Sequence, residues 1–270
     1  MAYFDHDGDS LHYAVEGNGP GVMLLHSLGG SLAMWETTVE ALKADFSVAA
    51  FDAQGHGRSS GNKPFTMERF AADAMALADR LGFQRFHVVG LSMGGRAAMR
   101  MAIHWPERVA SLVAADTSAG GSGGADRLAA VRRRITEVGH DAFAREYTQS
   151  RLMPQTPASV VARFAEDVCR TLPDVYMTTL GAIVGEDLSG EVGRIRTRTL
   201  VVVGANDVST PPDAARELAA AIPHAGLEII ADANHLANLD QPESFNTAVA
   251  RFLRAGALAG VEVAHSRGMR

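Results

Sequence analysis

Short runs of apolar residues recur through the first 120 residues, and longer amphipathic segments separate them. Apolar runs of this length without polar alternation are typical of strands that are buried on both faces of a parallel sheet. We therefore predict an α/β fold in which a mainly parallel sheet is flanked by helices. The expected strands are 11–15, 21–26, 46–51, 86–91 and 109–115, and the expected helices are 32–43, 66–81 and 93–104.

The alternation of apolar runs and amphipathic segments ends near Gly120, where the stretch AGGSGGAD predicts a flexible joint. From there to about Gly190 the pattern is helical and is broken by prolines, with no convincing strand. Strands return at 199–204 and 227–231, and helices are expected at 213–221 and 242–254. We expect a core domain of residues 1–120 and 191–256, a helical cap of residues 121–190 over its sheet, and a C-terminal tail of residues 257–270.

The stretch FHVVGLSMGGRAAMRMA places Ser92 where an apolar run changes into a helical one. Gly90 and Gly94 flank it, so no side chain crowds the turn. A strand, a tight turn and a helix with a serine at the turn form the layout of a nucleophile elbow, in which a strained backbone lifts the hydroxyl above the sheet. Ser92 is therefore the candidate nucleophile.

A serine hydroxyl needs a base within hydrogen-bond reach and a carboxylate that orients that base. Asp207 follows the expected strand TLVVVG, and His235 follows the next one, LEIIAD. The order serine, aspartate, histidine is the chain order of hydrolases that use such an elbow. Asp116 also ends a strand, in VAADTS, and is the alternative acid.

Acyl transfer also requires hydrogen-bond donors for the oxyanion. One expected donor is the backbone amide of Met93, directly after the nucleophile. The other is the amide of Leu28, because the turn His26-Ser27-Leu28-Gly29-Gly30 carries glycines that let the backbone approach a ligand.

Charge and composition limit the partners. The formal net charge of −6, with acidic and basic residues interspersed, predicts no nucleic-acid partner. The start of the chain lacks the pattern of a signal peptide, and no apolar run is long enough for a membrane span, so we expect a cytoplasmic protein without a membrane partner. The single Cys169 predicts neither an internal disulfide nor a thiolate zinc site. The sequence leaves open whether the protein forms a homo-oligomer.

From Tyr3 to Arg254 the chain resembles the α/β-hydrolase family, and within it the 3-oxoadipate enol-lactonases. The resemblance rests on the pieces HSLGGSLAMW, FDAQGHGRSS, GLSMGG, GANDVSTPP and ANHLANLDQPE. It implies a Ser92–His235–Asp207 triad, an acyl-enzyme route, no metal or other cofactor, and a lactone substrate. The chain departs from those lactonases in having Gln54 before its GHG turn, His26 instead of asparagine, and no aromatic residue after Arg151.

The first part of the expected cap is rich in arginine, and a guanidinium that faced the cavity would suit a substrate with a free carboxylate. Arg151 is the candidate for substrate binding, since the similar lactonases also have an arginine there. The remaining cap arginines are expected to face solvent: Arg127, Arg132, Arg133, Arg134 and Arg145.

The leading hypothesis is a serine hydrolase of a small carboxylic ester or lactone. Two other enzyme classes share the elbow and the triad, namely carbon–carbon bond hydrolases of aromatic ring-cleavage products and cofactor-free perhydrolases. A hypothesis from another class is a small-molecule receptor on a hydrolase scaffold. Haloalkane dehalogenases and epoxide hydrolases are excluded because they place an aspartate where this chain has Ser92.

Overall fold

The computed structural model describes residues 2–120 and 124–264. Eight strands form one sheet in the order β1-β2-β4-β3-β5-β6-β7-β8. The first two strands pair antiparallel with their neighbours, and all later pairs are parallel, so the mainly parallel sheet is confirmed. The strands are β1 (Ala2–His6), β2 (Asp9–Glu16), β3 (Gly21–Leu25), β4 (Ser47–Phe51), β5 (Phe86–Leu91), β6 (Val109–Ala115), β7 (Arg198–Gly204) and β8 (Gly226–Ile230).

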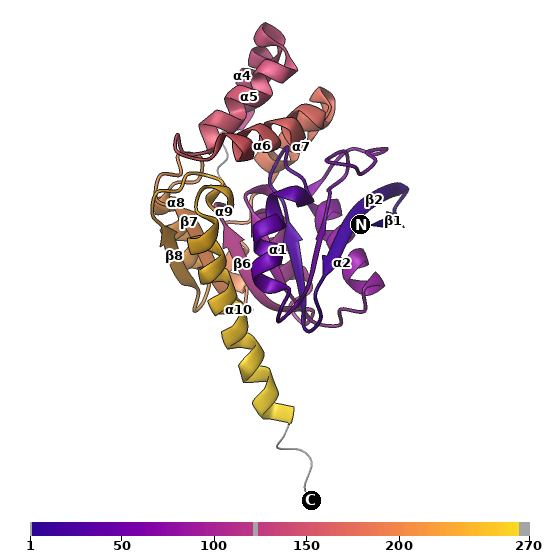
Figure 1. The fold of residues 1–270 in the computed structure, drawn as a ribbon, viewed down its shortest axis with the longest axis vertical. Helices are drawn as coiled ribbons and strands as arrows, with labels where there is room; N and C mark the ends of the chain where they lie inside the picture. The colour runs from indigo at the N-terminus through magenta and orange to yellow at the C-terminus, as the bar shows by residue number, and fades with distance from the viewer. Residues whose placement is uncertain (1, 121–123, 265–270) are drawn as a thin grey trace, which may run out of the picture.

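Helices cover the sheet and its carboxyl edge (Figure 1). The core helices are η1 (Leu32–Trp35), α1 (Glu36–Leu42), α2 (Met67–Arg80), α3 (Met93–His104), η2 (Val192–Arg194), α8 (Pro212–Ala221), α9 (Ala237–Asp240) and α10 (Pro242–Ala264). The central strands β3 and β5 are buried along their whole length, as expected for strands covered on both faces. The carboxyl ends of these strands therefore meet at one edge, where ligands bind in open α/β sheets.

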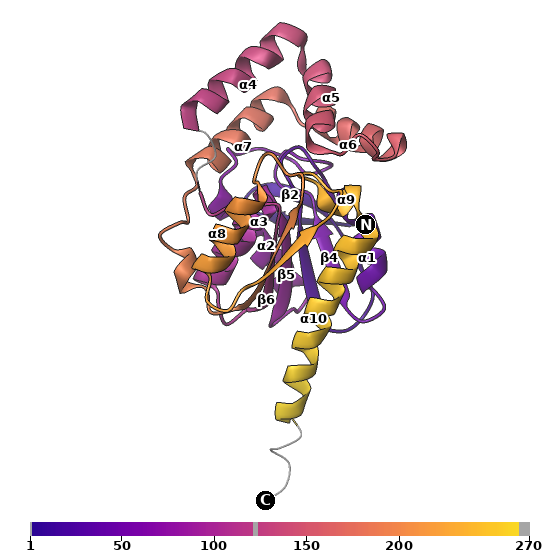
Figure 2. The same cartoon turned by 90° about the vertical axis from the view of Figure 1, so that its left-hand side faces the viewer.

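Four helices lie together above that edge (Figures 1 and 2). They are α4 (Gly124–Val138), α5 (His140–Arg151), α6 (Ala158–Arg170) and α7 (Pro173–Gly185). Pro173 occupies the first turn of α7, where a missing amide proton costs nothing. The division of the chain into a core domain and a cap domain stays a prediction, and residues 121–123 of the expected joint lie outside the described residues.

At both ends of the chain the structure has regular elements beyond the expected ones. No strand was expected before residue 11, yet β1 pairs with β2 across the two-residue turn Asp7-Gly8. Both turn residues have positive φ, which is the geometry that an Asp-Gly pair favours in a hairpin. At the other end, α10 continues to Ala264, past the expected helix end at Arg254. The C-terminal tail of residues 257–270 stays a prediction, and its residues 265–270 lie outside the described residues.

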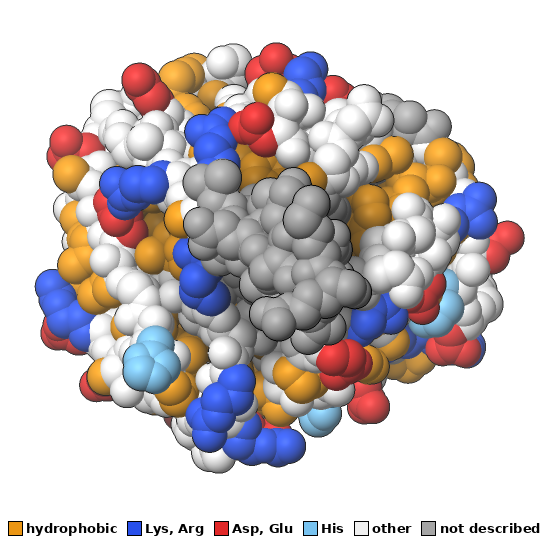
Figure 3. Space-filling model, turned by 90° about the horizontal axis from the view of Figure 1, so that it is seen from below, with side chains coloured by type: hydrophobic (Ala, Val, Ile, Leu, Met, Phe, Trp, Pro, Cys, Tyr) orange, Lys and Arg blue, Asp and Glu red, His pale blue; other side chains and the backbone are white. Residues whose placement is uncertain are grey.

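The face opposite the four helices is seen in Figure 3. Outside the area covered by undescribed residues, basic and acidic side chains lie interspersed with apolar ones. Among the described residues, no helix is both long enough and apolar enough to span a lipid bilayer.

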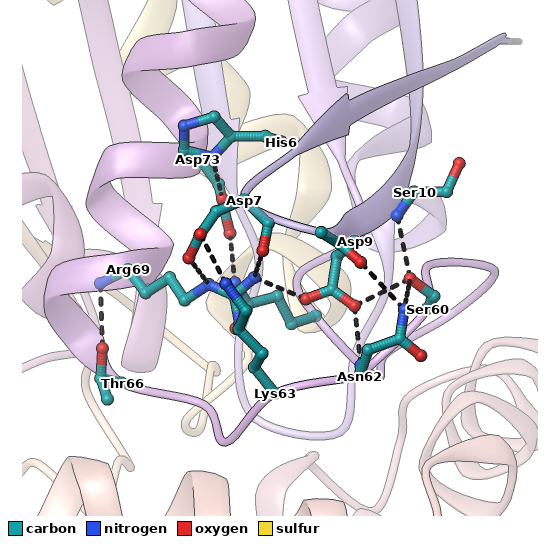
Figure 4. A network of polar contacts seen from close by, with 12 residues as sticks. His6, Asp7, Asp9, Ser10, Ser60, Asn62, Lys63, Thr66, Arg69 and Asp73 are labelled. Atoms are coloured by element: carbon teal, nitrogen blue, oxygen red, sulfur yellow. Dashed lines mark hydrogen bonds and ion pairs between the residues drawn. The ribbon is translucent and has the colours of Figure 1, made fainter.

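A buried carboxylate fastens β1 to α2 (Figure 4). Asp73 of α2 lies with its Oδ1 2.6 Å from Nδ1 of His6, and Gln54 Nε2 donates to its Oδ2 at 2.9 Å. Arg69, one turn earlier on α2, donates to Asp9 Oδ2 at 2.6 Å. Burial raises the pKa of Asp73 to about 6 even though its neighbours include cationic groups. This contact gives the fold a pH-dependent element beside the carboxyl end of β4.

Candidate active site

Ser92 lies between β5 and α3 with φ 56° and ψ −111°. This left-handed conformation is strained for a residue with a side chain, and it persists because the surroundings hold it. The Ser92 amide donates to the Ala115 carbonyl oxygen at 2.8 Å. A Cβ atom on Gly90 would overlap the Gly94 carbonyl group, and one on Gly94 would overlap the Leu25 carbonyl group. The two glycines are therefore required by the close approach of β3, β5 and α3.

Three loops at the carboxyl edge bring Ser92, His235 and Asp207 together. His235 Nε2 lies 2.9 Å from Ser92 Oγ, and His235 Nδ1 lies 2.8 Å from Asp207 Oδ2. Asp207 and His235 are buried. The serine follows β5, the aspartate follows β7 and the histidine follows β8. A continuous hydrogen-bond chain thus runs from a carboxylate through an imidazole to a hydroxyl.

The Asp207 carboxylate is held by its own loop. Its Oδ1 accepts from the amides of Ser209 at 2.7 Å and Thr210 at 3.0 Å, and its Oδ2 accepts from the Thr210 hydroxyl at 2.7 Å. Burial alone would raise the pKa of Asp207, but the hydrogen bonds and the nearby imidazole hold it below the ordinary value. Asp207 is therefore ionised at neutral pH. The contribution of Thr210 was missed by the sequence analysis.

Asp116, the alternative acid, lies in a different setting. Its Oδ1 accepts from the Gly204 amide at 2.8 Å and its Oδ2 from the Ala237 amide at 3.2 Å. Burial and the charge of Asp207 raise its pKa well above the ordinary value. The Asp116 carboxyl group therefore ties β7 to the loop after His235, whereas Asp207 contacts the imidazole.

The turn after β3 lies beside Ser92. Leu28 lines the same cavity as Ser92 and His235, and Gly29 has φ 71°. Met93 is the first residue of α3, where amide groups have no acceptor within the helix. In the part of the chain that the structure describes, neither the Leu28 amide nor the Met93 amide donates a backbone hydrogen bond outside regular helices and strands. Both amides are thus available to an external acceptor.

His26, one of the departures from the lactonase pattern, has a structural role. It is fully buried, its Nδ1 lies 2.8 Å from the Ser27 carbonyl oxygen, and its Nε2 accepts from the Ala53 amide at 2.9 Å. Burial lowers the pKa of His26, so the imidazole is neutral with its proton on Nδ1. The side chain joins the turn that contains Leu28 to the end of β4.

A cavity of about 340 Å³ opens above Ser92 and His235. Three arginines line it, and no aspartate or glutamate does. The lining residues come from the carboxyl-edge loops and from α3, α4, α5 and α7: Leu28, Ser92, Arg96, Thr117, Ser118, Arg127, Tyr147, Arg151, Ile183, Val208, Ser209, Thr210 and His235. The cavity is therefore suited to an anionic molecule.

Arg151 ends α5 and reaches toward the acid loop. Its Nη1 donates to the Ser209 hydroxyl, and its guanidinium lies 4.9 Å from the centre of the Tyr147 ring. Arg127, expected to face solvent, also lines the cavity. Arg132, Arg133, Arg134 and Arg145 are exposed and do not line it.

Arg96 was missed by the sequence analysis. It lies one helical turn after Ser92 on α3 and is buried. Its Nη1 donates to the carbonyl oxygens of Ile183 at 2.9 Å and Glu186 at 2.7 Å, and its Nη2 donates to Ser118 Oγ at 3.0 Å. Burial lowers its pKa to about 10, so it stays cationic at neutral pH. Arg96 therefore joins the segments that enter and leave the four-helix region.

A larger groove of about 850 Å³ runs between α5 and α6. It is lined mostly by apolar residues such as Leu152, Val161 and Ala165, and it shares no lining residue with the cavity above Ser92. The described residues contain no group of three or more histidine, cysteine, aspartate or glutamate side chains placed to hold a metal ion.

Comparison with known proteins places the chain in a family. The model of the alpha/beta hydrolase family matches residues 11–248. The chain is 30% identical over 247 residues to 3-oxoadipate enol-lactonase 2 of Acinetobacter baylyi, covering 89% of this chain and 91% of the relative. It is 31% identical over 261 residues to the candidate carbamate hydrolase RutD of Caulobacter sp. (strain K31), covering 91% and 96%.

A solved structure is also similar. The enol-lactonase from Burkholderia xenovorans LB400 superposes with a TM-score of 0.88 at 30% identity, covering 94% of this chain and all of the other. With its sheet order, its elbow and these matches, the chain belongs to the alpha/beta hydrolase family.

Proposed function

We propose that this protein hydrolyses a small carboxylic ester or lactone through an acyl-enzyme on Ser92. The observation that carries this proposal is the hydrogen-bond chain from Asp207 through His235 to Ser92 at the floor of the cavity. Ionised Asp207 keeps the His235 proton on Nδ1, so Nε2 is free to accept a proton. The remaining parts of the reaction follow from that tautomer.

His235 Nε2 removes the Ser92 proton as Oγ attacks the substrate carbonyl carbon. The amides of Leu28 and Met93 donate to the oxyanion that forms. The tetrahedral intermediate collapses, and His235 gives its proton to the leaving oxygen. His235 then takes a proton from water as the water oxygen attacks the acyl-enzyme carbonyl carbon, and it returns this proton to Ser92 Oγ when the bond between Oγ and the acyl group breaks and the acid leaves.

We propose a carboxylate-bearing substrate, and among such substrates an enol-lactone. Arg151 lines the cavity beside the Asp207 loop together with Arg96 and Arg127, and no aspartate or glutamate is among the lining residues. A guanidinium forms charge-assisted, often bidentate, hydrogen bonds with a carboxylate. Support for the lactone comes from two similar proteins, both described as enol-lactonases. Helices α4 to α7 act as the cap that selects the substrate.

The test is a hydrolysis screen of the wild-type protein against Ser92→Ala. The panel holds p-nitrophenyl acetate, saturated lactones, 3-oxoadipate enol-lactone, a carbamate and ring-cleavage acids. We expect the wild type to open the enol-lactone and to cleave the simple ester, and Ser92→Ala to lose at least about 10³-fold in kcat. Absence of ester and lactone turnover by the wild type would refute the proposal. Turnover confined to the carbamate or to the ring-cleavage acids would move the substrate assignment to that class.

A further inference from the structure

A second cavity adjoins the one above Ser92. It has a volume of about 260 Å³, lies among α4, α5 and α7, and opens to solvent beside the exposed side chains of Arg134 and Glu146. Helix α4 packs on both α5 and α7, and Figure 2 shows the three helices arched above the sheet. Arg127, Tyr147 and Arg151 line both cavities. We refer to this space as the upper chamber.

The walls of the upper chamber are mostly apolar and aromatic. Val131, Phe143, Tyr176 and Leu180 line it, together with Arg134, Glu146 and Ser150. The Phe143 and Tyr176 rings meet edge to face at 5.4 Å, and Tyr147 meets Tyr176 in the same way at 5.8 Å. Arg134 and Glu146 are exposed and pair with each other at 2.6 Å. Their charges are therefore satisfied by each other, and apart from Arg127, Ser150 and Arg151 the surface left for a ligand is aliphatic or aromatic.

Three side chains border both the upper chamber and the catalytic cavity. Arg127 extends from α4, and Tyr147 and Arg151 extend from α5. Each side chain can move by rotamer changes without displacing a helix. Arg151 lies against the Tyr147 ring, so this shared border has an aromatic part and a cationic part. A ligand could hold a carboxylate at the cationic part and extend an apolar group past it.

From this arrangement we propose that the upper chamber binds an apolar or aromatic group of the substrate, beyond its carboxylate or acyl chain. The proposal rests on the proposed ester or lactone hydrolysis at Ser92 and specifies its substrate class. The natural substrate is then larger than a compact lactone ring. An apolar group that enters the chamber is removed from water, which favours its binding. The enzyme should therefore prefer a substrate that carries such a group over one that lacks it.

Kinetics with a chain-length series test this preference. The substrates are the p-nitrophenyl esters of acetic acid and of phenylalkanoic acids with two to five methylene groups. The wild type should favour at least one phenylalkanoyl ester over the acetyl ester about tenfold or more in kcat/KM. Val131→Phe, which adds bulk to the chamber wall, should lower that ratio about tenfold. Val138→Phe is the matched control, because Val138 is a partly buried residue of the same helix that lines neither cavity.

A variant that enlarges the chamber should change the substrate preference in the opposite direction. Leu180→Ala enlarges the chamber and should shift the optimum of the series toward longer acyl chains. If Val131→Phe lowers kcat/KM for the acetyl and phenylalkanoyl esters equally, the chamber is an entry path and the proposal is wrong. It is also wrong if the ratio in Val131→Phe equals that in Val138→Phe.

Binding separates this inference from the proposed function. Calorimetric titration of the wild type with 6-phenylhexanoate and with hexanoate requires no turnover. We expect 6-phenylhexanoate to bind about tenfold more tightly, and Val131→Phe to remove the difference. Tight binding without any ester hydrolysis would keep the upper chamber and refute the proposed function. Hydrolysis of the acetyl ester with equal binding of the two acids would do the reverse.

Discussion

Asp207→Asn tests which carboxyl group completes the proposed triad. An asparagine keeps the size of the side chain but offers one acceptor oxygen and one donating amide group. Its oxygen can keep the two backbone hydrogen bonds from Ser209 and Thr210, so its amide group is left to face His235. His235 must then present Nδ1 as an acceptor, and its proton moves to Nε2. That nitrogen can no longer take a proton from Ser92.

The expected loss is large. The corresponding exchange in a serine protease triad lowers kcat about 10⁴-fold, which equals ~5 kcal/mol of transition-state stabilisation. The assay is stopped-flow hydrolysis of p-nitrophenyl acetate, with kcat and KM measured separately. We expect the loss in kcat and little change in KM, since Asp207 does not line the cavity. A circular dichroism spectrum like that of the wild type would show that the variant is folded.

Asp116→Asn is the matched control. Burial and the charge of Asp207 raise the pKa of Asp116, and its hydrogen bonds go to the Gly204 and Ala237 amides and not to His235, so asparagine at this position leaves the contact between Asp207 and His235 in place. One of its two hydrogen bonds to backbone amides is lost, which costs ~1 kcal/mol of stability. Since a tenfold change in kcat corresponds to about that free energy, we expect kcat to fall less than about tenfold. If Asp116→Asn loses 10⁴-fold and Asp207→Asn does not, the assignment of the acid is wrong.

Three further predictions concern other groups. Arg151→Met should raise KM about tenfold or more for a carboxylate-bearing ester and leave a neutral ester unchanged, because a charge-assisted hydrogen bond is worth ~2 kcal/mol; equal effects on both esters would contradict this. Arg96→Met should lower the free energy of unfolding, measured in urea, by ~3 kcal/mol, because it leaves buried carbonyl groups without a donor; a loss below about 1 kcal/mol would count against it. The pKa of Asp73, about 6 against an ordinary 3.8, means that the folded state holds this proton more tightly, so the stability it contributes is lost as pH rises from about 4 to about 6. Relative to the wild type, Asp73→Asn should therefore gain ~3 kcal/mol between pH 4 and pH 8 in urea unfolding, and a pH-independent difference would refute the assignment.

The sequence determined the sheet and the place of the nucleophile. Apolar runs without alternation predict buried parallel strands, and β3 to β7 are such strands at the expected positions, whereas β2 pairs antiparallel and β8 is only partly buried. The glycines around Ser92 signal a tight strand-to-helix turn because only glycine permits that approach of backbones. A local signal was also present where no strand was predicted, because an Asp-Gly pair forms the turn between β1 and β2.

Only the tertiary structure decided which side chains meet. Asp116 and Asp207 both end strands, and the sequence left them as alternatives; the fold directs one toward backbone amides and the other toward His235. The sequence also did not distinguish the arginines that line the cavity from those that face solvent. Arg127 lines the cavity, whereas Arg132 is exposed. Local patterns record the periodicity of burial, whereas contacts between residues far apart in the chain depend on how helices and loops pack. The triad geometry, the cationic cavity and the upper chamber are all contacts of that second kind.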